Sequence, residues 1–567
     1  MRGPGRVAAP LAVLLAASLA ACSPALPETV VPDTSITVGW SGELTSANAA
    51  ASPTSGNIDI AETIRGDFGD VIDGEFVPDE GFGTVTIVSE DPFTVRYDLA
   101  EPSWSDDIPL DAADLLLGWA GASGYFDRGE DDGAGDAESD ADPAVPSIDE
   151  FERAIEVTFA QPVKDWQQAV TVPVPAHVVG SRAFGIEDAM EAKQAVIRAI
   201  QEHDAAALEA ISEVWNEGFE LSDQDEIPAD LLLSSGPFLV DGIESADEGQ
   251  SVTLVPNPSY RGSVTPQVAR IDLVPAGDDA VTAVGDRLDV AQVAPVASNR
   301  EPIRELERTD FTVDTTHDGT LWAMLLNPSE VFASPEARTA FIRAAPASEL
   351  AERGAGDWAS AYTGTTSMVS APGSRAYDIV NEDSGFTEAL GTPDDEPAQA
   401  RQAAGVGDGT RVCVLYDRRS EFAVGAFRAL REAAGEAGWN VDDCGSDDLD
   451  AALAQGGWDA VIARVPIPET PDEIAAQWGT GGDASITGNA DPDRDALIAQ
   501  LAQTTDVYEA RDVLAQIEAT IVRAAVALPI AANPRVTIVD RDVEGVTARN
   551  GATASLTYGV AQWAVVQ

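Results

Sequence analysis

Alternation of apolar and polar residues marks two neighbouring stretches in the first part of the chain. Thr84–Val88 and Phe93–Leu99 mostly place every second side chain on one apolar face, which is the pattern of half-buried strands. Glu90-Asp91-Pro92 separates them, and this composition is typical of a turn. The pattern therefore predicts an antiparallel pair of strands, and Ile155–Phe159 repeats it as a third alternating strand.

Helical periodicity appears between these short strands. Asp111–Ala120 and Ile186–Val214 both show it, the second stretch as one or two amphipathic helices. Ser334-Pro335-Glu336 predicts a helix start, because serine caps a helix, proline fits the first turn and an acid favours the positive end of the helix dipole. Further short strands are predicted at Ile36–Trp40, Phe76–Pro78, Ser251–Val255 and Ala269–Val274.

Residues 411–464 differ from the first part of the chain, because predicted strands and helices alternate there. The predicted order is strand Val412–Tyr416, helix Glu421–Ala437, strand Trp439–Val441, helix Leu449–Gln455 and strand Trp458–Ala463. Such alternation implies a parallel sheet. A long helix at Tyr508–Ala527 and two returning strands at Leu528–Ile530 and Val536–Val539 follow. The chain therefore combines a mixed α+β first part with an α/β second part.

The N-terminus has the pattern of an export signal. Arg2 and Arg6 form a small basic region, and the apolar stretch Ala8–Ala21 is too short for a permanent membrane span. Leu19-Ala20-Ala21-Cys22 resembles the bacterial lipobox, in which a lipid is attached to the cysteine and the chain is cut just before it. The alternative is an ordinary cleavable signal with a chance cysteine.

The lipobox resemblance implies where the protein is located. It predicts a signal peptide at residues 1–21, a lipidated Cys22, and a body held on the extracytoplasmic face of the cell membrane. Residues 22–34 are rich in proline and predict a flexible tether. After the signal no apolar run approaches the length of a membrane span, so we expect the lipid to be the only anchor.

Charge narrows the choice of partners. The chain has 97 acidic and 33 basic residues and a formal net charge of −64. Such a surface repels phosphate backbones and anionic headgroups, which excludes nucleic acid as a partner. The acids are spread along the whole chain, so we interpret them as a solubility feature. The acidic stretch 127–142 lacks the EF-hand spacing and predicts a solvated loop. We expect a monomer.

Two cysteines remain once Cys22 is set aside. Cys413 and Cys444 bracket a strand, a helix and the next strand, so neighbouring parallel strands can bring their sulfur atoms together. An even pair in an exported protein suggests one disulfide. The alternative is a pair of free buried thiols.

The usual motifs of enzymes are missing. His177, His203 and His317 lie far apart in sequence, and there is no zinc-binding His-Glu-x-x-His helix, no Gly-x-Ser-x-Gly elbow and no P-loop. Gly405–Gly409 precedes a strand and does not follow one, so it predicts a turn and not a dinucleotide site. We therefore predict no catalytic residue, no metal site and no cofactor, and the sequence favours a binding role.

Several short motifs follow one another along nearly the whole chain. They are Thr94–Leu99, Trp104–Asp114, Ser235–Phe238, Asn257–Gly262, Gly285–Val290, Gly488–Leu497 and Ala527–Ile530. Their order and spacing resemble the family 5 solute-binding proteins of bacterial ABC importers, the oligopeptide- and dipeptide-binding type. Asp107 and Asp111 stand where that family usually has glycine and threonine.

The resemblance implies a periplasmic-binding-protein-like fold of class C, or type II, within the α/β class. Two lobes, a mixed α+β first lobe and an α/β second lobe, would close over a solute in the interlobe cleft. The first lobe would comprise residues 35–280 and 521–567, with a smaller subdomain at about 50–175, and the second lobe residues 281–520. The partners would be a small solute, in the first instance a peptide bound in extended form, and the permease subunits of an ABC transporter.

Charged candidates for solute binding lie where dipeptide binders often carry a Trp-x-x-Asp-Tyr-Pro-Asp-Pro segment. Residues 463–471 take that place here without the tryptophan and the paired aspartates. Glu469 is the candidate anionic anchor, and Arg464 is the candidate partner of a solute carboxylate. The alternative is that both are solvated loop charges.

Aromatic candidates come from strand ends. Trp40 and Ser41 end the first strand, where the family places ligand-facing backbone. Trp322 and Asn327 lie in the apolar segment Leu321–Asn327, and Trp478 follows the Glu469 loop. Core packing is the alternative for each ring, and we expect at least one to face the solute.

These observations predict a lipid-anchored receptor that hands a solute, in the first instance a peptide, to a permease. A non-peptide solute on the same fold, such as an oligosaccharide or a metal chelate, is the first alternative. An exported glycoside hydrolase is the rival from another class, and it would need two carboxylates at a fixed separation. A degenerate binding protein acting as a surface adhesion or sensor partner is the third.

Overall fold

A computed structural model describes residues 27–72, 74–126, 144–149, 153–221, 227–277, 279–393, 396–552 and 555–566. The predicted signal peptide, Cys22 and the acidic stretch 127–142 lie outside these ranges. Within them, no helix is both long and apolar enough to cross a membrane. The first strand begins at Val31, so the last residues of the predicted tether belong to the folded body. A register irregularity between Val31 and Ser35 accommodates Pro32 in this strand.

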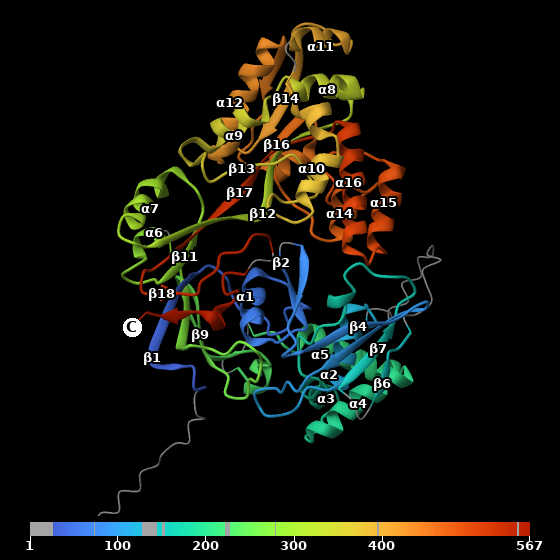
Figure 1. Cartoon of the computed structure of the whole chain (residues 1–567), viewed down its shortest axis with the longest axis vertical. Helices are drawn as coiled ribbons and strands as arrows, with labels where there is room; N and C mark the ends of the chain where they lie inside the picture. Colours follow the sequence, from blue (N-terminus) through green and yellow to red (C-terminus); the bar gives the residue numbers. More distant parts are fainter. Residues whose placement is uncertain are drawn as a thin grey trace, which may run out of the picture.

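One large mixed sheet runs through the molecule (Figure 1). Its strands, in spatial order, are β15 (Trp439–Asp443), β14 (Thr410–Tyr416), β16 (Ala460–Pro466), β12 (Thr312–Leu326), β17 (Ala527–Val539), β11 (Val290–Val293), β1 (Val31–Trp40), β10 (Val268–Pro275), β9 (Gly249–Pro256) and β8 (Phe238–Ala246). The short strand β13 (Thr363–Gly364) also pairs with β17.

The two longest strands cross between the halves of the molecule. β12 and β17 pair from Thr312 opposite Val539 to Leu325 opposite Ala527. At one end β17 continues the sheet into β11 and β1, and along the other end β12 pairs with β16. We call the part around β1, β8–β10 and the residues before β10 the first lobe, and the part around β14–β16 the second lobe. β12 and β17 connect them (Figure 1).

The prediction of two separate returning strands is wrong, because β17 is continuous. Pro529 and Pro534 suggested a break, since proline cannot donate to a strand ladder. The structure accommodates them at register shifts, one between His317 and Leu321 of β12 and one between Trp322 and Ala323. Extra residues bulge out at each shift, so the strand bends without ending.

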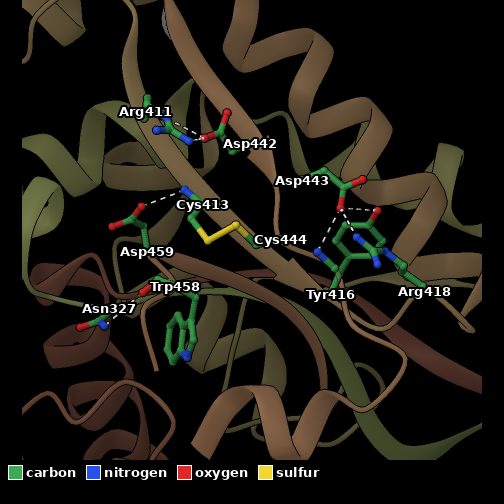
Figure 2. The surroundings of a disulfide bond; sticks show 11 residues. Asn327, Arg411, Cys413, Tyr416, Arg418, Asp442, Asp443, Cys444, Trp458 and Asp459 are labelled. Carbon is green, nitrogen blue, oxygen red and sulfur yellow. Dashed lines mark hydrogen bonds and ion pairs between the residues drawn. A yellow bond between two sulfur atoms is a disulfide. The ribbon is translucent and has the colours of Figure 1, made fainter. Parts of the chain in front are cut away.

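The predicted α/β unit is confirmed in the second lobe. β14 is flanked by β15 and β16, both parallel to it, and α12 (Glu421–Glu436) and α13 (Leu449–Gln455) make the crossovers. Cys413 and Cys444 form a disulfide between the β14 and β15 segments, with their Cα atoms 5.6 Å apart (Figure 2). The bond ties the edge strand β15 to its neighbour.

Helices cover both faces of the second-lobe sheet. One apolar core contains Met324, Leu326 and Ile462, and the other contains Leu321, Leu325 and Val461, as the two-residue period of a strand requires. The first core is covered by α8 (Pro335–Arg343), α9 (Ala347–Ala355) and α12, and the second by α14 (Pro471–Trp478), α15 (Pro492–Ala502) and α16 (Val507–Ala524). Outside these lie α10 (Tyr377–Asp383) on α16 and α11 (Pro397–Ala403) on α8. As predicted, Ser334 caps α8, and its side chain accepts from the Ala337 N–H.

The first lobe contains a separate antiparallel sheet, and the predicted pairing is confirmed there. Its order is β4 (Gly83–Glu90), β5 (Phe93–Leu99), β7 (Ala154–Thr158) and β6 (Ser147–Asp149). Near it pack α2 (Ala112–Ala122), α3 (Ala176–Phe184), α4 (Ala189–Glu202) and α5 (Ala205–Glu217). The remaining elements are α1 (Ser55–Ile64), the β2 (Gly69–Ile72) and β3 (Glu75–Pro78) hairpin, α6 (Ala280–Ala283), α7 (Arg300–Glu307), β18 (Val543–Glu544) and β19 (Ala564–Val565).

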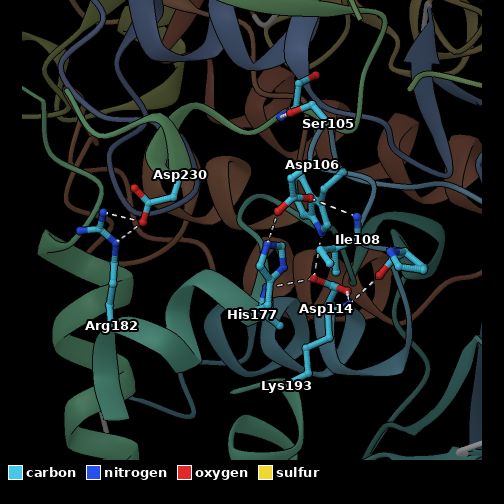
Figure 3. Close-up of polar contacts among 12 residues, drawn as sticks. Ser105, Asp106, Ile108, Asp114, His177, Arg182, Lys193 and Asp230 are labelled. Carbon is cyan, nitrogen blue, oxygen red and sulfur yellow. Dashed lines mark hydrogen bonds and ion pairs between the residues drawn. The ribbon is translucent and has the colours of Figure 1, made fainter. Parts of the chain in front are cut away.

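The Trp104–Asp114 motif forms a buried polar network beside α2 (Figure 3). Lys193 of α4 places its Nζ 2.7 Å from Asp114 Oδ2 and 2.6 Å from the Pro109 carbonyl oxygen. The other oxygen of Asp114 accepts from Trp104 Nε1 and from the Ala176 N–H. The motif therefore holds the fold together and lies away from the junction of the lobes.

Candidate functional site

Strand register places two of the predicted residues side by side. Trp322 of β12 lies directly opposite Arg464 of β16, and cross-strand partners project from the same face of a sheet. Further along the same face, Met324 and Ile462 belong to the apolar core. Trp322 and Arg464 thus lie near the end of this row, followed only by the Thr320–Pro466 pair, on the side where β12 leaves the second lobe.

Trp322 is part of a stack of three aromatic rings. It lies 4.6 Å from the Phe422 ring, measured between centroids, at an interplanar angle of 19°. Phe422, in the first turn of α12, stacks on Tyr362 at 4.9 Å and 26°. Tyr362 remains half-buried. Its burial, reinforced by Asp318 and Glu421 and opposed by Arg464, raises the pKa of its hydroxyl to about 12, so this group is a neutral donor at physiological pH.

Polar groups from β12 and β17 hold this stack in place. Trp322 Nε1 donates to Asn533 Oδ1 at 2.9 Å, and Asn533 Nδ2 donates to Asp318 Oδ2 at 2.7 Å. Asp318 also accepts from the Thr320 N–H and hydroxyl. These three β12 residues lie at the two register shifts, so the irregular part of the ladder positions the site.

Arg464 is the loosely held cation of this group. Its side chain is 54% exposed, and its Nη1 lies 3.7 Å from Asp318 Oδ2, beyond hydrogen-bond distance. Asp318 meanwhile accepts shorter bonds from Asn533 and Thr320. A guanidinium with free donor capacity beside flat aromatic walls is suited to bind a carboxylate through two parallel hydrogen bonds.

On the first-lobe side, Trp40 is buried. Its Nε1 donates to Asp59 Oδ2 of α1 at 2.9 Å. Burial raises the pKa of Asp59, although hydrogen bonds from Trp40, Ser555 and Leu556 and the charge of Arg535 lower it. Ser41, the next residue, is exposed. Arg535 of β17 interacts electrostatically with both Asp59 and Asp318, so it links the two sides.

Two further acids lie on and after α1. Glu62 and Asp67 are exposed, yet desolvation raises the pKa of both carboxyls to about 7. The charge of Asp70 adds to this rise, while the charge of Arg549 lowers the pKa of Glu62 and a hydrogen bond from the Phe68 N–H lowers that of Asp67. A group that reaches water and is still desolvated is surrounded by protein on its other sides. Near neutral pH these two carboxyls are therefore close to half protonated.

Glu469 meets the first lobe through the C-terminal segment. Its Oε1 accepts from the Ala552 N–H at 3.3 Å. The same segment is bound to β12, because the Gly551 N–H donates to the His317 carbonyl and the His317 N–H donates to Asn550 Oδ1. Glu469 thus lies at a contact between the lobes and is already engaged by the backbone of residue 552.

Two of the predicted residues lie elsewhere. Asn327 follows the far end of β12, where its Nδ2 donates to the Trp458 carbonyl near the disulfide (Figure 2). Trp478 ends α14 inside an apolar core, and its carbonyl accepts from the buried Arg494. The structure therefore places Trp322, Arg464 and Glu469 at the junction of the lobes and connects Trp40 to them through Asp59 and Arg535. Ser41 lies at the surface after Trp40, and Asn327 and Trp478 stay within the second lobe.

The sequence did not point to six further residues that surround these candidates. Asp59, Asp318, Tyr362, Phe422, Asn533 and Arg535 were not predicted. Asn533 carried one usable signal, since an Asn-Pro pair inside an apolar strand marks an irregularity. Where the structure describes the chain, no cluster of three or more His, Cys, Asp or Glu side chains is arranged to hold a metal ion.

Comparison with known proteins defines the class. The model of the bacterial extracellular solute-binding proteins, family 5, matches residues 85–485, so the chain belongs to this family. Members bind small solutes and work with ABC transporter permeases. An uncharacterized lipoprotein of Mycobacterium tuberculosis is 25% identical over 512 residues, which cover 87% of this chain and 86% of the relative.

Two solved structures share the fold. The periplasmic EDTA-binding protein EppA superimposes with a TM-score of 0.73 at 18% identity, covering 94% of this chain and 97% of EppA. The oligopeptide-binding protein AppA from Bacillus subtilis, in complex with a nonapeptide, gives a TM-score of 0.59 at 12% identity, covering 94% of this chain and 99% of AppA. The predicted two-lobe binding-protein fold is therefore confirmed.

Proposed function

We propose that this chain is a lipid-anchored extracytoplasmic receptor that captures a carboxylate-bearing solute, in the first instance a peptide, and delivers it unchanged to an ABC permease. The observation that carries the proposal is the half-exposed Arg464 beside the Trp322 stack, where β12 leaves the second lobe. The lobe limits at residues 280/281 and 520/521, and the anchor at Cys22, are part of the proposal.

Arg464 supplies the recognition chemistry in this proposal. Its partner Asp318 is 3.7 Å away and is satisfied by other donors, so a solute carboxylate would gain two charge-assisted hydrogen bonds without leaving a buried acid unpaired. The aromatic stack next to it offers an apolar wall for the adjoining part of the solute. Binding of this kind needs no covalent step.

Peptides and metal chelates both satisfy this chemistry. AppA binds a nonapeptide and EppA is named for EDTA, and both ligands carry carboxylates. A chelate is the second candidate, because it would present its carboxylates to Arg464 without needing metal ligands from the protein. The described residues contain no such metal-holding cluster, which disfavours capture of a bare metal ion.

Native mass spectrometry of the purified protein tests the proposal. A retained peptide would add a mass that fragments into amino-acid residues, whereas a chelate would add a metal isotope pattern that chelator exchange removes. Incubation with labelled peptides and glycans provides the counter-test. Turnover of either substrate would contradict a receptor that releases its solute unaltered.

Replacing Arg464 tests the site itself. We expect Arg464→Gln to weaken affinity for the identified solute by about 10- to 100-fold, because hydrogen bonds to charged groups contribute roughly 1.5–3 kcal/mol. Isothermal titration calorimetry measures the change. Arg411→Gln is the matched control, since Arg411 is an exposed arginine paired with Asp442 beside the disulfide (Figure 2). Equal affinities for the two variants would rule out Arg464 as the carboxylate partner.

A further inference from the structure

The β2–β3 hairpin of the first lobe points at the second lobe (Figure 1). Glu75 begins β3 next to the hairpin turn. Its Oε2 lies 2.5 Å from Arg375 Nη1, and its Oε1 pairs with Arg511 Nη2 of α16. Each carboxylate oxygen therefore binds one arginine of the opposite lobe. The Glu75 and Arg511 side chains are only 25% and 14% exposed, so water screens this pair weakly.

Helix α16 holds both arginines in place, one directly and one through a neighbouring loop. Arg511 and Glu518 are on α16, two turns apart. Glu518 is buried, and its Oε2 accepts from the Ser367 hydroxyl at 2.6 Å, the Met368 N–H at 2.9 Å and the Val369 N–H at 3.1 Å. That segment leads along the chain to Arg375. The helix thus carries one arginine and anchors the loop that carries the other.

The base of the hairpin is tied to its own lobe. Arg549 Nη1 donates to Asp70 Oδ2 of β2 at 2.7 Å, and the guanidinium lies 3.8 Å from the centroid of the Tyr558 ring. Arg549 also donates to the Val71 carbonyl. Movement of the hairpin tip is therefore coupled to the first lobe through its C-terminal segment.

From this geometry we infer that Glu75, Arg375 and Arg511 form a clasp that holds the two lobes in contact. A carboxylate bound by two guanidiniums gains two charge-assisted interactions at once. In this chain acidic residues outnumber basic ones, 97 to 33, so two arginines on a single acid run against the overall composition. A backbone hydrogen bond of 2.9 Å from the Lys164 N–H in the first lobe to the Ala502 carbonyl in the second lobe also joins the two lobes. The clasp rests on the two-lobe closure of the proposed function, but it acts without a solute.

Distance measurement in the solute-free, full-length protein tests the clasp. Spin labels on non-natural amino acids replace Val88 of β4 and Gln500 of α15, both exposed and on opposite lobes. Pulsed electron double resonance then reports the populations of short and long separations. We expect the wild type to be mostly short, and Glu75→Gln to shift the short-to-long ratio by about tenfold towards long, because a part-buried charged pair is lost.

Two further variants make the result specific. Arg511→Gln should lengthen the distance nearly as much as Glu75→Gln does, because the Arg375 side chain that would still pair with Glu75 is 66% exposed and contributes little. The double variant should do no more than Glu75→Gln alone, since that change already removes both pairs. Glu156→Gln is the control, because Glu156 pairs with Arg96 inside the first lobe. A wild type without the short population, a Glu75→Gln distribution equal to that of Glu156→Gln, or additive effects of the two substitutions would overturn the clasp. Because no solute is present, failure here leaves the proposed function to its own tests.

Discussion

Replacing Lys193 by methionine is expected to lower the free energy of unfolding of the first lobe by about 3–5 kcal/mol, the usual cost of removing one partner of a buried ion pair. Lys193 and Asp114 side chains are 1% and 0% exposed, with Nζ and Oδ2 2.7 Å apart. Without the ammonium, the Asp114 charge stays buried. The Pro109 carbonyl loses its donor as well. Calorimetric melting and urea unfolding of wild type and variant measure the change.

Arg182→Gln is the matched control for this prediction. Arg182 and Asp230 form an ion pair near the same network, with side chains 30% and 46% exposed (Figure 3). Exposed pairs contribute about 0–1 kcal/mol, so this variant should unfold almost as the wild type does. A second variant, Lys193→Met with Asp114→Asn, should be less destabilised than Lys193→Met alone, because no charge is left buried and the amide oxygen can still accept from Trp104 Nε1 and the Ala176 N–H. Equal stability of Lys193→Met and Arg182→Gln would refute the assigned role.

Local patterns were sufficient to predict much of the fold. The alternating stretches at 84–88 and 93–99 pair as expected, Ser334 caps its helix, and the α/β unit of residues 411–464 has the predicted order. Each of these features depends on neighbours within a few tens of residues. Periodicity and capping chemistry act over that range, so a single sequence is enough to recognise them.

Long-range pairing could not be predicted in the same way. Thr312 lies opposite Val539, and no local pattern specifies that register. The site depends on it, because Trp322 meets Asn533 only through the β12–β17 ladder. Because the sequence does not specify this register, Asn327 was also chosen as a candidate. It follows the end of β12 that lies away from the junction. Lys193 likewise sits in an amphipathic helix that gives no sign of a buried partner on another element.

Stability is expected to fall as the pH rises from about 5 to 8, the reverse of ordinary acid denaturation. Glu518 is buried, and burial raises its pKa to about 7 from a usual 4.5, although hydrogen bonds from Ser367, Met368 and Val369 and the charge of Arg494 lower it. The folded state therefore holds a proton that the unfolded state releases. This contribution is complete below pH 4.5 and is lost as the pH rises through 7.

The difference between the pKa of Glu518 in the folded state and its usual value also gives the size of the expected change in stability. A shift of one pKa unit corresponds to about 1.4 kcal/mol, so Glu518 alone accounts for roughly 3 kcal/mol. Desolvation raises the pKa of Glu62 and Asp67 in the same direction. The net charge of −64 adds self-repulsion that grows as carboxyls ionise. The melting temperature should therefore be higher at pH 5.5 than at pH 8.

Glu518→Gln separates the buried carboxyl from the general charge effect. An amide oxygen can accept the same hydrogen bonds but does not ionise, so the variant should match the wild type near pH 5 and exceed its stability at pH 8. Glu436→Gln, at an exposed position on α12, should keep the wild-type slope. Calorimetric scans across this pH range decide the matter. If Glu518→Gln and Glu436→Gln melt with the same pH slope, the proton on Glu518 does not couple to folding, and repulsion across the acidic surface accounts for the trend.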